Sequence, residues 1–246
     1  MSKLQNVSFA DFKELKEKIK RDVPSANSYE EALQRYTSII YEQFKDSIIL
    51  IRTFATRPFG KLPEANQKFV NDLAQAKEIS HLINDEMLVL TLLGTAGVET
   101  EWFDRKNSQG HVGIPLASAD FIDAIPMMSR LLKQIGLGLE WIDNKDTELV
   151  KKTIIERMSG LFFVPDATTE VDQEGRKIIS ANDFVEEYHV KTVFGYGDGY
   201  SGTDTFMVTI VFLRETISRE KAEQIYAAMN FFKPMTLWLV KNQFFS

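Results

Sequence analysis

The fold class is decided by one stretch, Val190-Lys-Thr-Val-Phe-Gly-Tyr-Gly-Asp-Gly-Tyr-Ser-Gly-Thr-Asp-Thr-Phe-Met-Val-Thr-Ile-Val-Phe-Leu213. Apolar, β-branched and aromatic residues fill 190–194 and 205–213, which is the composition of strands. Between them, the four glycines of residues 195–202 predict a turn. Two strands joined by a glycine-rich connection form an antiparallel hairpin in the simplest arrangement. The stretch therefore favours an α+β fold built on an antiparallel sheet.

Other strands and helices surround this hairpin without a regular βαβ rhythm. A proline at position 126 predicts that the helical pattern over residues 118–135 kinks or divides into two short helices. A closing helix begins near Ser218, and Pro234 interrupts it. The remaining periodic segments predict strands over residues 46–54, 87–93 and 160–165 and a helix over residues 64–77.

The first 45 residues predict two amphipathic helices, separated by a break at Pro24. Each helix begins at a serine with an acidic residue three positions later, the pattern of a capping box. We therefore divide the chain into a helical extension, residues 1–45, and a domain, residues 46–246. Each helix carries one apolar stripe: Phe12, Leu15 and Ile19 in the first, and Tyr36, Ile40 and Phe44 in the second. We predict a homodimer that uses one stripe or the other. The alternative is that these residues cover the domain's own sheet.

Composition narrows the class of protein. The 246 residues carry a net charge of −6 and no basic run, which argues against a nucleic-acid partner. There is no cysteine, which excludes disulfides, thiolate nucleophiles and cysteine-ligated metals. The polar N-terminus and the short apolar runs predict a chain without signal peptide or membrane span, and hence a cytoplasmic protein.

A loop rich in aromatic and charged residues follows the apolar run Leu88–Gly97. Because loops display binding groups on a rigid scaffold, we expect ligand-binding residues there. Trp102 walls a pocket or belongs to the core. Asp104 and Arg105 clamp a carboxylate or phosphate, or form a surface pair. His111 bonds a ligand or a metal, or fixes its own loop.

Arg52 is the fifth candidate, because an unpaired charge inside an apolar strand is costly. It faces solvent on an edge strand, or it reaches a pocket or an acidic partner. No catalytic constellation accompanies these residues. The glycines of residues 195–199 lack the ending of a phosphate-binding loop, and the three histidines form no closely spaced ligand pair. The sequence therefore predicts a protein that is not an enzyme.

Two sets of short motifs carry a resemblance. The more specific set is Leu92-Leu-Gly-Thr-Ala-Gly97, Glu99, Trp102, Asp104-Arg105, Ser108, Gly110-His111 and Ile114-Pro-Leu116. The weaker set is Arg52-Thr-Phe54, Pro58-Phe-Gly60, Leu62-Pro63, Phe163-Val-Pro165, Phe184-Val185 and Val193-Phe-Gly195. Together they extend over residues 46–240, and this region resembles the GAF-like sensor region that precedes histidine kinase or serine phosphatase modules in bacterial signalling proteins.

The resemblance implies a GAF/PAS-like antiparallel sheet with helices on one side. It implies a cytoplasmic bacterial sensor that binds a small molecule of unknown identity between sheet and helices, under a lid formed by residues 95–118. No output module follows before Ser246, so we expect a stand-alone sensor or an excised part that acts on a signalling partner. Two alternatives stay open: a protein–protein regulator with a self-filled pocket, and a haem or metal sensor that uses His111. No cofactor is assigned.

Overall fold

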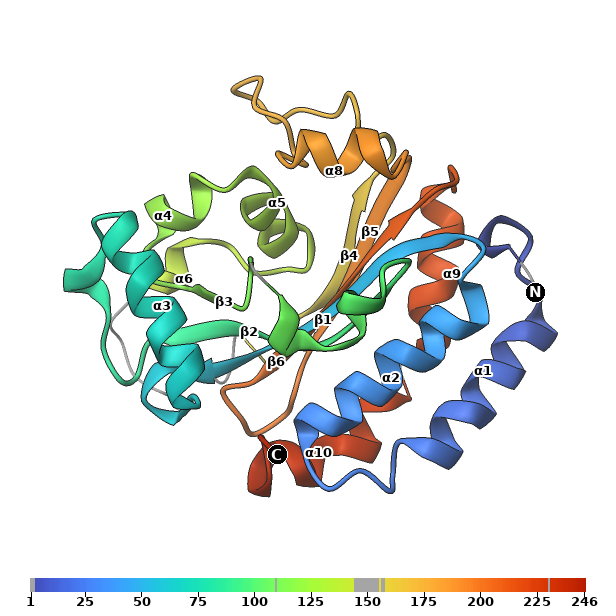
Figure 1. Ribbon diagram of the computed structural model, residues 1–246, viewed down its shortest axis with the longest axis horizontal. Helices are drawn as coiled ribbons and strands as arrows, with labels where there is room; N and C mark the ends of the chain where they lie inside the picture. Colours follow the sequence, from blue (N-terminus) through green and yellow to red (C-terminus); the bar gives the residue numbers. More distant parts are fainter. Residues whose placement is uncertain (1–2, 109, 144–154, 156–157, 230) are drawn as a thin grey trace.

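The computed structural model describes residues 3–108, 110–143, 155, 158–229 and 231–246. In these residues, six antiparallel strands form one sheet in the order β3-β2-β1-β6-β5-β4 (Figure 1). The predicted α+β class with an antiparallel sheet is therefore confirmed. The strands are β1 (Ile48–Pro58), β2 (Leu88–Gly97), β3 (Gly113–Pro115), β4 (Ser159–Val164), β5 (Thr192–Gly199) and β6 (Phe206–Leu213).

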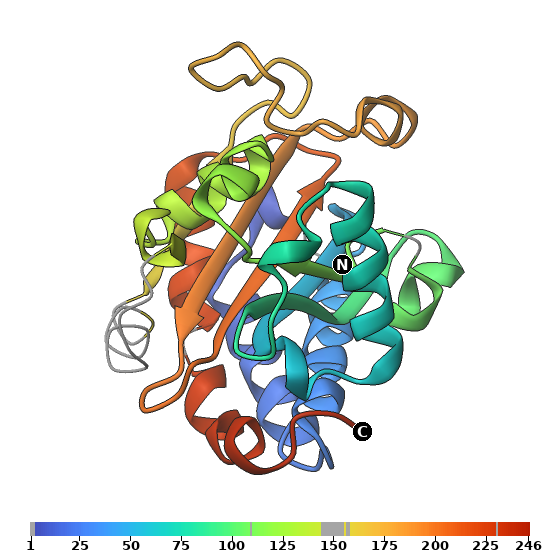
Figure 2. The same ribbon diagram turned by 90° about the vertical axis from the view of Figure 1, so that its left-hand side faces the viewer.

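Helices cover both faces of the sheet, so the expectation of helices on one side is wrong (Figures 1 and 2). Every residue of β2, β5 and β6 is buried, and a sheet with two apolar faces has to be covered twice. One face packs against α1 (Phe9–Asp22), α2 (Tyr29–Phe44), α9 (Arg219–Met229) and α10 (Phe232–Asn242). The other packs against α4 (Ala119–Asp123), α5 (Pro126–Gln134), α6 (Glu140–Asp143) and α8 (Asn182–Glu187).

The β2–β3 edge of the sheet carries its own small core under α3 (Glu64–Ala76). Val70 of α3 packs with Val89 of β2, and the Asn66 side-chain amide donates to the Thr91 hydroxyl at 3.0 Å. β3 pairs with β2, although it lies inside a segment that the sequence predicts to be a loop. The predicted lid, residues 95–118, is therefore partly fixed to the sheet.

The predicted hairpin is confirmed as β5 and β6, but its turn is shorter than expected. β5 continues to Gly199, and the pairing runs from Thr192 opposite Leu213 to Gly199 opposite Phe206. The glycines serve close packing within the sheet. A Cβ on Gly195 would lie 2.8 Å from the Thr209 carbonyl oxygen, a distance that real Cβ atoms do not show.

Both proline predictions describe breaks that the structure contains. The pattern over residues 118–135 divides into α4 and α5, with Pro126 as the first residue of α5, where its missing N–H costs nothing. The closing helix divides into α9 and α10 before Pro234, which lies in the first turn of α10. None of the described helices is both long and apolar enough to cross a membrane.

The apolar stripes of α1 and α2 are buried within the single chain. Leu15, Ile19, Tyr36 and Phe44 are at most 1% exposed, Ile40 is 5% exposed, and Phe12 packs against the same core. The prediction that these stripes form a dimer interface is therefore wrong, because they cover the chain's own sheet. α2 shares one core with β1, β2, β5 and β6. The boundary at residue 45 stays a prediction.

A row of hydroxyl groups, which we call the hydroxyl seam, crosses the core between the sheet and the terminal helices. The Tyr36 and Tyr196 hydroxyls lie 2.8 Å apart. The Tyr29 hydroxyl donates to that of Tyr200, 3.1 Å away, and Tyr200 also contacts the Thr236 hydroxyl at 2.7 Å. Because each buried hydroxyl finds a partner, the polar atoms carry little desolvation cost.

Candidate functional site

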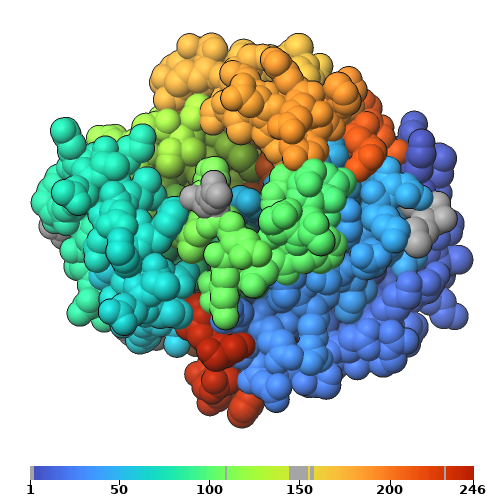
Figure 3. All heavy atoms as spheres, in the orientation of Figure 1, coloured from blue at the N-terminus to red at the C-terminus, as the bar shows by residue number. Residues whose placement is uncertain are grey.

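The face covered by α4–α8 is hollowed. Figure 3 shows the hollow between the orange segment that contains α8, the yellow-green segment that contains α5 and the green segment that follows β2. That green segment holds two short 3-10 helices, η4 (Thr100–Phe103) and η5 (Arg105–Asn107). All the loop residues predicted from sequence lie in or just after this segment.

Arg52 projects from β1 toward this face of the sheet. It lies between Leu50 and Phe54, whose side chains belong to the core under α4–α8, and it stands opposite Ile210 of β6. Its side chain is half-buried, and its Nε is buried without a hydrogen-bond partner in the described residues. Burial lowers the pKa of the guanidinium. A buried donor without a partner costs free energy that a ligand acceptor would recover.

His111 follows η5 in the same loop and interacts electrostatically with Arg52. Its backbone φ of +58° is left-handed, a conformation that few residues other than glycine adopt. The side chain keeps contact with solvent, yet lost hydration and the positive charge of Arg52 lower the pKa of His111. The imidazole is therefore neutral at pH 7, with one ring nitrogen free to accept and the other to donate.

Trp102 contacts two aromatic rings, one of α8 and one of the residue that follows it. Its ring centroid lies 5.1 Å from that of Tyr188 and 5.9 Å from that of Phe184. The Tyr188 hydroxyl donates to a carboxylate oxygen of Glu99 at 3.1 Å, which ties the same two segments together. The indole is half-buried and packs against the core of this face, and its role as a pocket wall stays a prediction.

Asp104 and Arg105 each bind another of the described residues and do not form an ion pair with each other. Asp104 is exposed and caps η5 by accepting from the Lys106 N–H at 2.9 Å. The Arg105 Nε donates to the Glu30 carboxylate, and the two side chains are only 12% and 14% exposed. The pair joins the loop to the start of α2.

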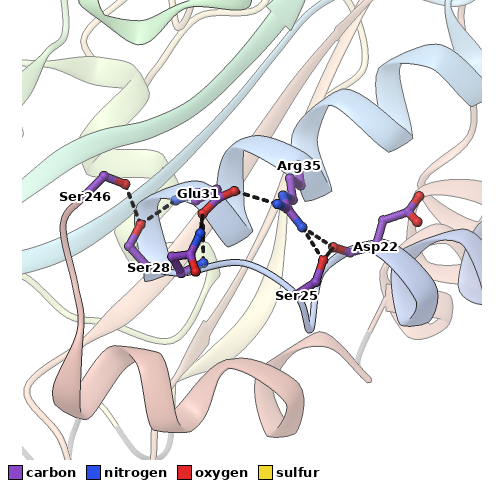
Figure 4. Close-up of polar contacts among 7 residues, drawn as sticks. Asp22, Ser25, Ser28, Glu31, Arg35 and Ser246 are labelled. Carbon is purple, nitrogen blue, oxygen red and sulfur yellow. Dashed lines mark hydrogen bonds and ion pairs between the residues drawn. The ribbon is translucent and has the colours of Figure 1, made fainter.

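The chain's C-terminal residues dock at the same turn of α2. The Ser246 N–H donates to Glu30 at 3.2 Å, and the Ser246 and Ser28 hydroxyls lie 2.7 Å apart (Figure 4). Ser28 caps α2, and Glu31 pairs with Arg35, whose guanidinium also donates to the Asp22 carbonyl. Arg105 therefore belongs to a structural joint, and its contact with a ligand stays a prediction.

The structure thus brings Arg52 near His111 and places Trp102 beside α8. Sequence reasoning missed the contact of Tyr188 with Trp102, although Phe184 and Tyr188 are spaced four residues apart, as aromatic residues on one helix face are. No cluster of three potential metal ligands occurs in the part of the chain that the structure describes.

No protein-family model matches the chain, and no curated protein matches it. Among solved structures, the chain is similar to the phycoerythrobilin-bound GAF domain from a cyanobacterial phytochrome. The TM-score is 0.41 at 9% sequence identity, and the match covers 95% of this chain and 96% of that one. A likeness at this level assigns no ligand and no binding residue to this chain.

Proposed function

We propose that this chain is a non-catalytic module that binds a small molecule with an anionic group in the hollow over β1. The observation that carries the proposal is the buried Arg52 Nε, which lacks a partner in the described residues. A carboxylate or phosphate on Arg52 would satisfy that donor and compensate the buried charge. His111 would add a second hydrogen bond, and Trp102 would cover the ligand.

The setting that we propose is bacterial, cytoplasmic signalling, and it rests on the resemblance of residues 46–240 to GAF-like sensor regions. Ligand binding would be transmitted by a change in the packing of α9 and α10, with the ligand selecting one of two arrangements. Support comes from the hydroxyl seam, which links β5 directly to α2 and α10.

Native mass spectrometry of the purified protein tests the binding proposal. We expect a retained small molecule on the wild-type chain, and its loss from Arg52→Met and His111→Gln. Arg21→Met is the matched control, because Arg21 is exposed and its ion pair is with its neighbour Asp22. Full retention by both site variants would refute the site. A wild-type chain that carries no ligand, and that no carboxylate or phosphate compound stabilises thermally, would refute the function.

A homodimer stays part of the proposal, with an interface outside the two buried stripes. Light scattering decides it. A monomer at high micromolar concentration would exclude the dimer without affecting the ligand site.

A further inference from the structure

A second cavity lies on the other side of β1, where that strand ends. Its volume is about 250 Å³, several times the roughly 30 Å³ of a water molecule in the liquid. Five parts of the chain form its walls: the end of β1, Lys61, the start of β2, the β5–β6 turn and the end of α10. Figure 1 shows these segments together near the C-terminus. Neither Arg52 nor His111 lines this cavity.

Arg57 is the least exposed of the basic groups in this cavity. Its guanidinium carbon lies 4.5 Å from the centre of the Phe244 ring, so the cation stacks on an aromatic face. Its Nε is buried and has no hydrogen-bond partner in the described residues. Burial lowers the pKa of Arg57, and the negative charge of Asp204 opposes that effect. Stacking uses the flat face of the guanidinium, so the Nε–H on its edge is left without a hydrogen-bond partner in the described residues.

Two lysines complete a basic rim. Lys61 and Lys241 line the same cavity, are exposed, and form no ion pair with any described residue. The Lys241 ammonium lies over Gly202, 3.7 Å from the position of a Cβ there. Gly202 has φ of +69°, a left-handed backbone conformation that favours glycine.

The charge balance of the lining selects the ligand. Three basic side chains face two acidic ones, Glu86 and Asp204, in a chain whose net charge is −6. The local excess is positive, which attracts an anion. The two carboxylates oppose a polyanion, so a single anionic group fits best.

We infer that this cavity is a binding site for a small molecule that carries one oxyanion, a carboxylate or a phosphate. The oxyanion lies along the free edge of Arg57 and between the ammonium groups of Lys61 and Lys241. Arginine suits this contact because its planar donors match the geometry of oxyanions. The inference does not rest on the proposed function, because the site uses the opposite face of β1.

The probes are inorganic phosphate and acetate, added in separate titrations at constant ionic strength. The readout is the NMR signal of the Arg57 Nε–H group, assigned by its loss in Arg57→Lys. We expect one of the two anions to shift this signal with saturation. Which of them saturates distinguishes a phosphate ligand from a carboxylate ligand.

A double variant, Lys61→Gln with Lys241→Gln, keeps the fold because both lysines are exposed. We expect it to weaken the saturating anion by roughly tenfold or more, about 1.4 kcal/mol. The matched control is Lys3→Gln with Lys13→Gln, two exposed lysines outside the cavity, which should leave affinity unchanged. Shifts that never saturate, or equal affinities in both double variants, would overturn the inference. Arg52→Met should have no effect on this titration, which separates the two sites.

Discussion

Two arginines of β1 carry the two binding sites that we propose. Side chains alternate along a strand, so Arg52 and Arg57, five positions apart, project to opposite faces. Each has a buried Nε without a partner in the described residues, and each lies beside a loop that supplies further polar groups. Such unsatisfied donors are rare in folded proteins, which makes the two positions the ones to test.

After burial, the positive charge of Arg52 is the second cause of the lowered pKa of His111. Replacing Arg52 by methionine removes the positive charge that lowers the pKa of His111, so we expect this pKa to rise. The imidazole would then be protonated over a wider pH range. NMR titration of the His111 ring measures the change, and His111→Gln assigns the signal. Arg57→Met is the control, because it removes the same charge from the opposite face. An equal shift in both variants would show that Arg52 has no special contact.

The close approach of α2 to β2 depends on Gly94. A Cβ there would lie 2.5 Å from the Thr37 hydroxyl oxygen and 2.7 Å from the Leu33 carbonyl oxygen. We expect Gly94→Ala to displace α2 and lower the free energy of unfolding by about 1–3 kcal/mol. Urea unfolding measures the loss. Gly110→Ala is the control, since a Cβ at Gly110 meets no atom within 4 Å. Equal midpoints for both variants would contradict the prediction.

The residues of the predicted site differ in whether a local sequence pattern reveals them. Arg52 stood out from the sequence because a charge in an apolar run is unusual wherever the strand packs. The Arg105–Glu30 pair was invisible, because its partners lie 75 positions apart and no spacing rule joins them. The cavity at Arg57 was not predicted for the same reason, because Lys241 lies far along the sequence from Arg57 and Lys61.

At the scale of elements, apolar runs predicted the positions of the strands, whereas glycines led to a wrong prediction of where β5 ends. Gly195, Gly197 and Gly199 were assigned to a turn, because glycine usually marks one. In β5 they make room instead for neighbouring atoms: at Gly197 a Cβ would lie 2.7 Å from the Met158 methyl carbon. β3 was missed because three residues are too few to form a periodic pattern.

The hydroxyl seam that joins α2, β5 and α10 predicts an alkaline limit to stability. Burial raises the pKa of Tyr196 to about 12 and that of Tyr36 well above its ordinary value near 10. The folded chain therefore holds protons that the unfolded chain releases above about pH 10. Stability should be constant below that pH and fall as pH rises toward 12.

Urea midpoints measured from pH 8 to 12 test this, with tyrosinate absorbance recorded in parallel. We expect tyrosine ionisation to coincide with unfolding. The double variant Tyr36→Phe with Tyr196→Phe removes both hydroxyls of one contact, so it should weaken the dependence on pH. Tyr29 and Tyr200, whose pKa values burial also raises, should maintain the rest of it. Ionisation of every tyrosine in a chain that is still folded would contradict the assignment.

At the scale of the whole molecule, the sheet separates two large cores, and the N-terminal helices complete one of them. Leu15, Ile19 and Val23 are at most 1% exposed. Burial of each such side chain stabilises a fold by roughly 1.5–3 kcal/mol. Residues 1–27 thus act on stability even if they form a separate extension in sequence.

Deletion of residues 1–27 should therefore lower the unfolding free energy by several kcal/mol, on the order of three such side chains. Thermal unfolding followed by circular dichroism measures the loss. Phe9→Ala is the control, because Phe9 is 86% exposed and should tolerate truncation. A truncated chain with the melting temperature of the full chain would contradict this prediction.

The central position of β1 also has a consequence for how the chain acquires its structure. β1 lies between β2, which follows it soon in the sequence, and β6, whose residues pair with it from far along the chain, as Ile210 does with Arg52. During synthesis, β1 and β2 can pair while the other edge of β1 waits for β6. Contacts between such distant segments slow folding, and an open strand edge recruits wrong partners. Refolding should therefore be slow, and its yield should fall as protein concentration rises.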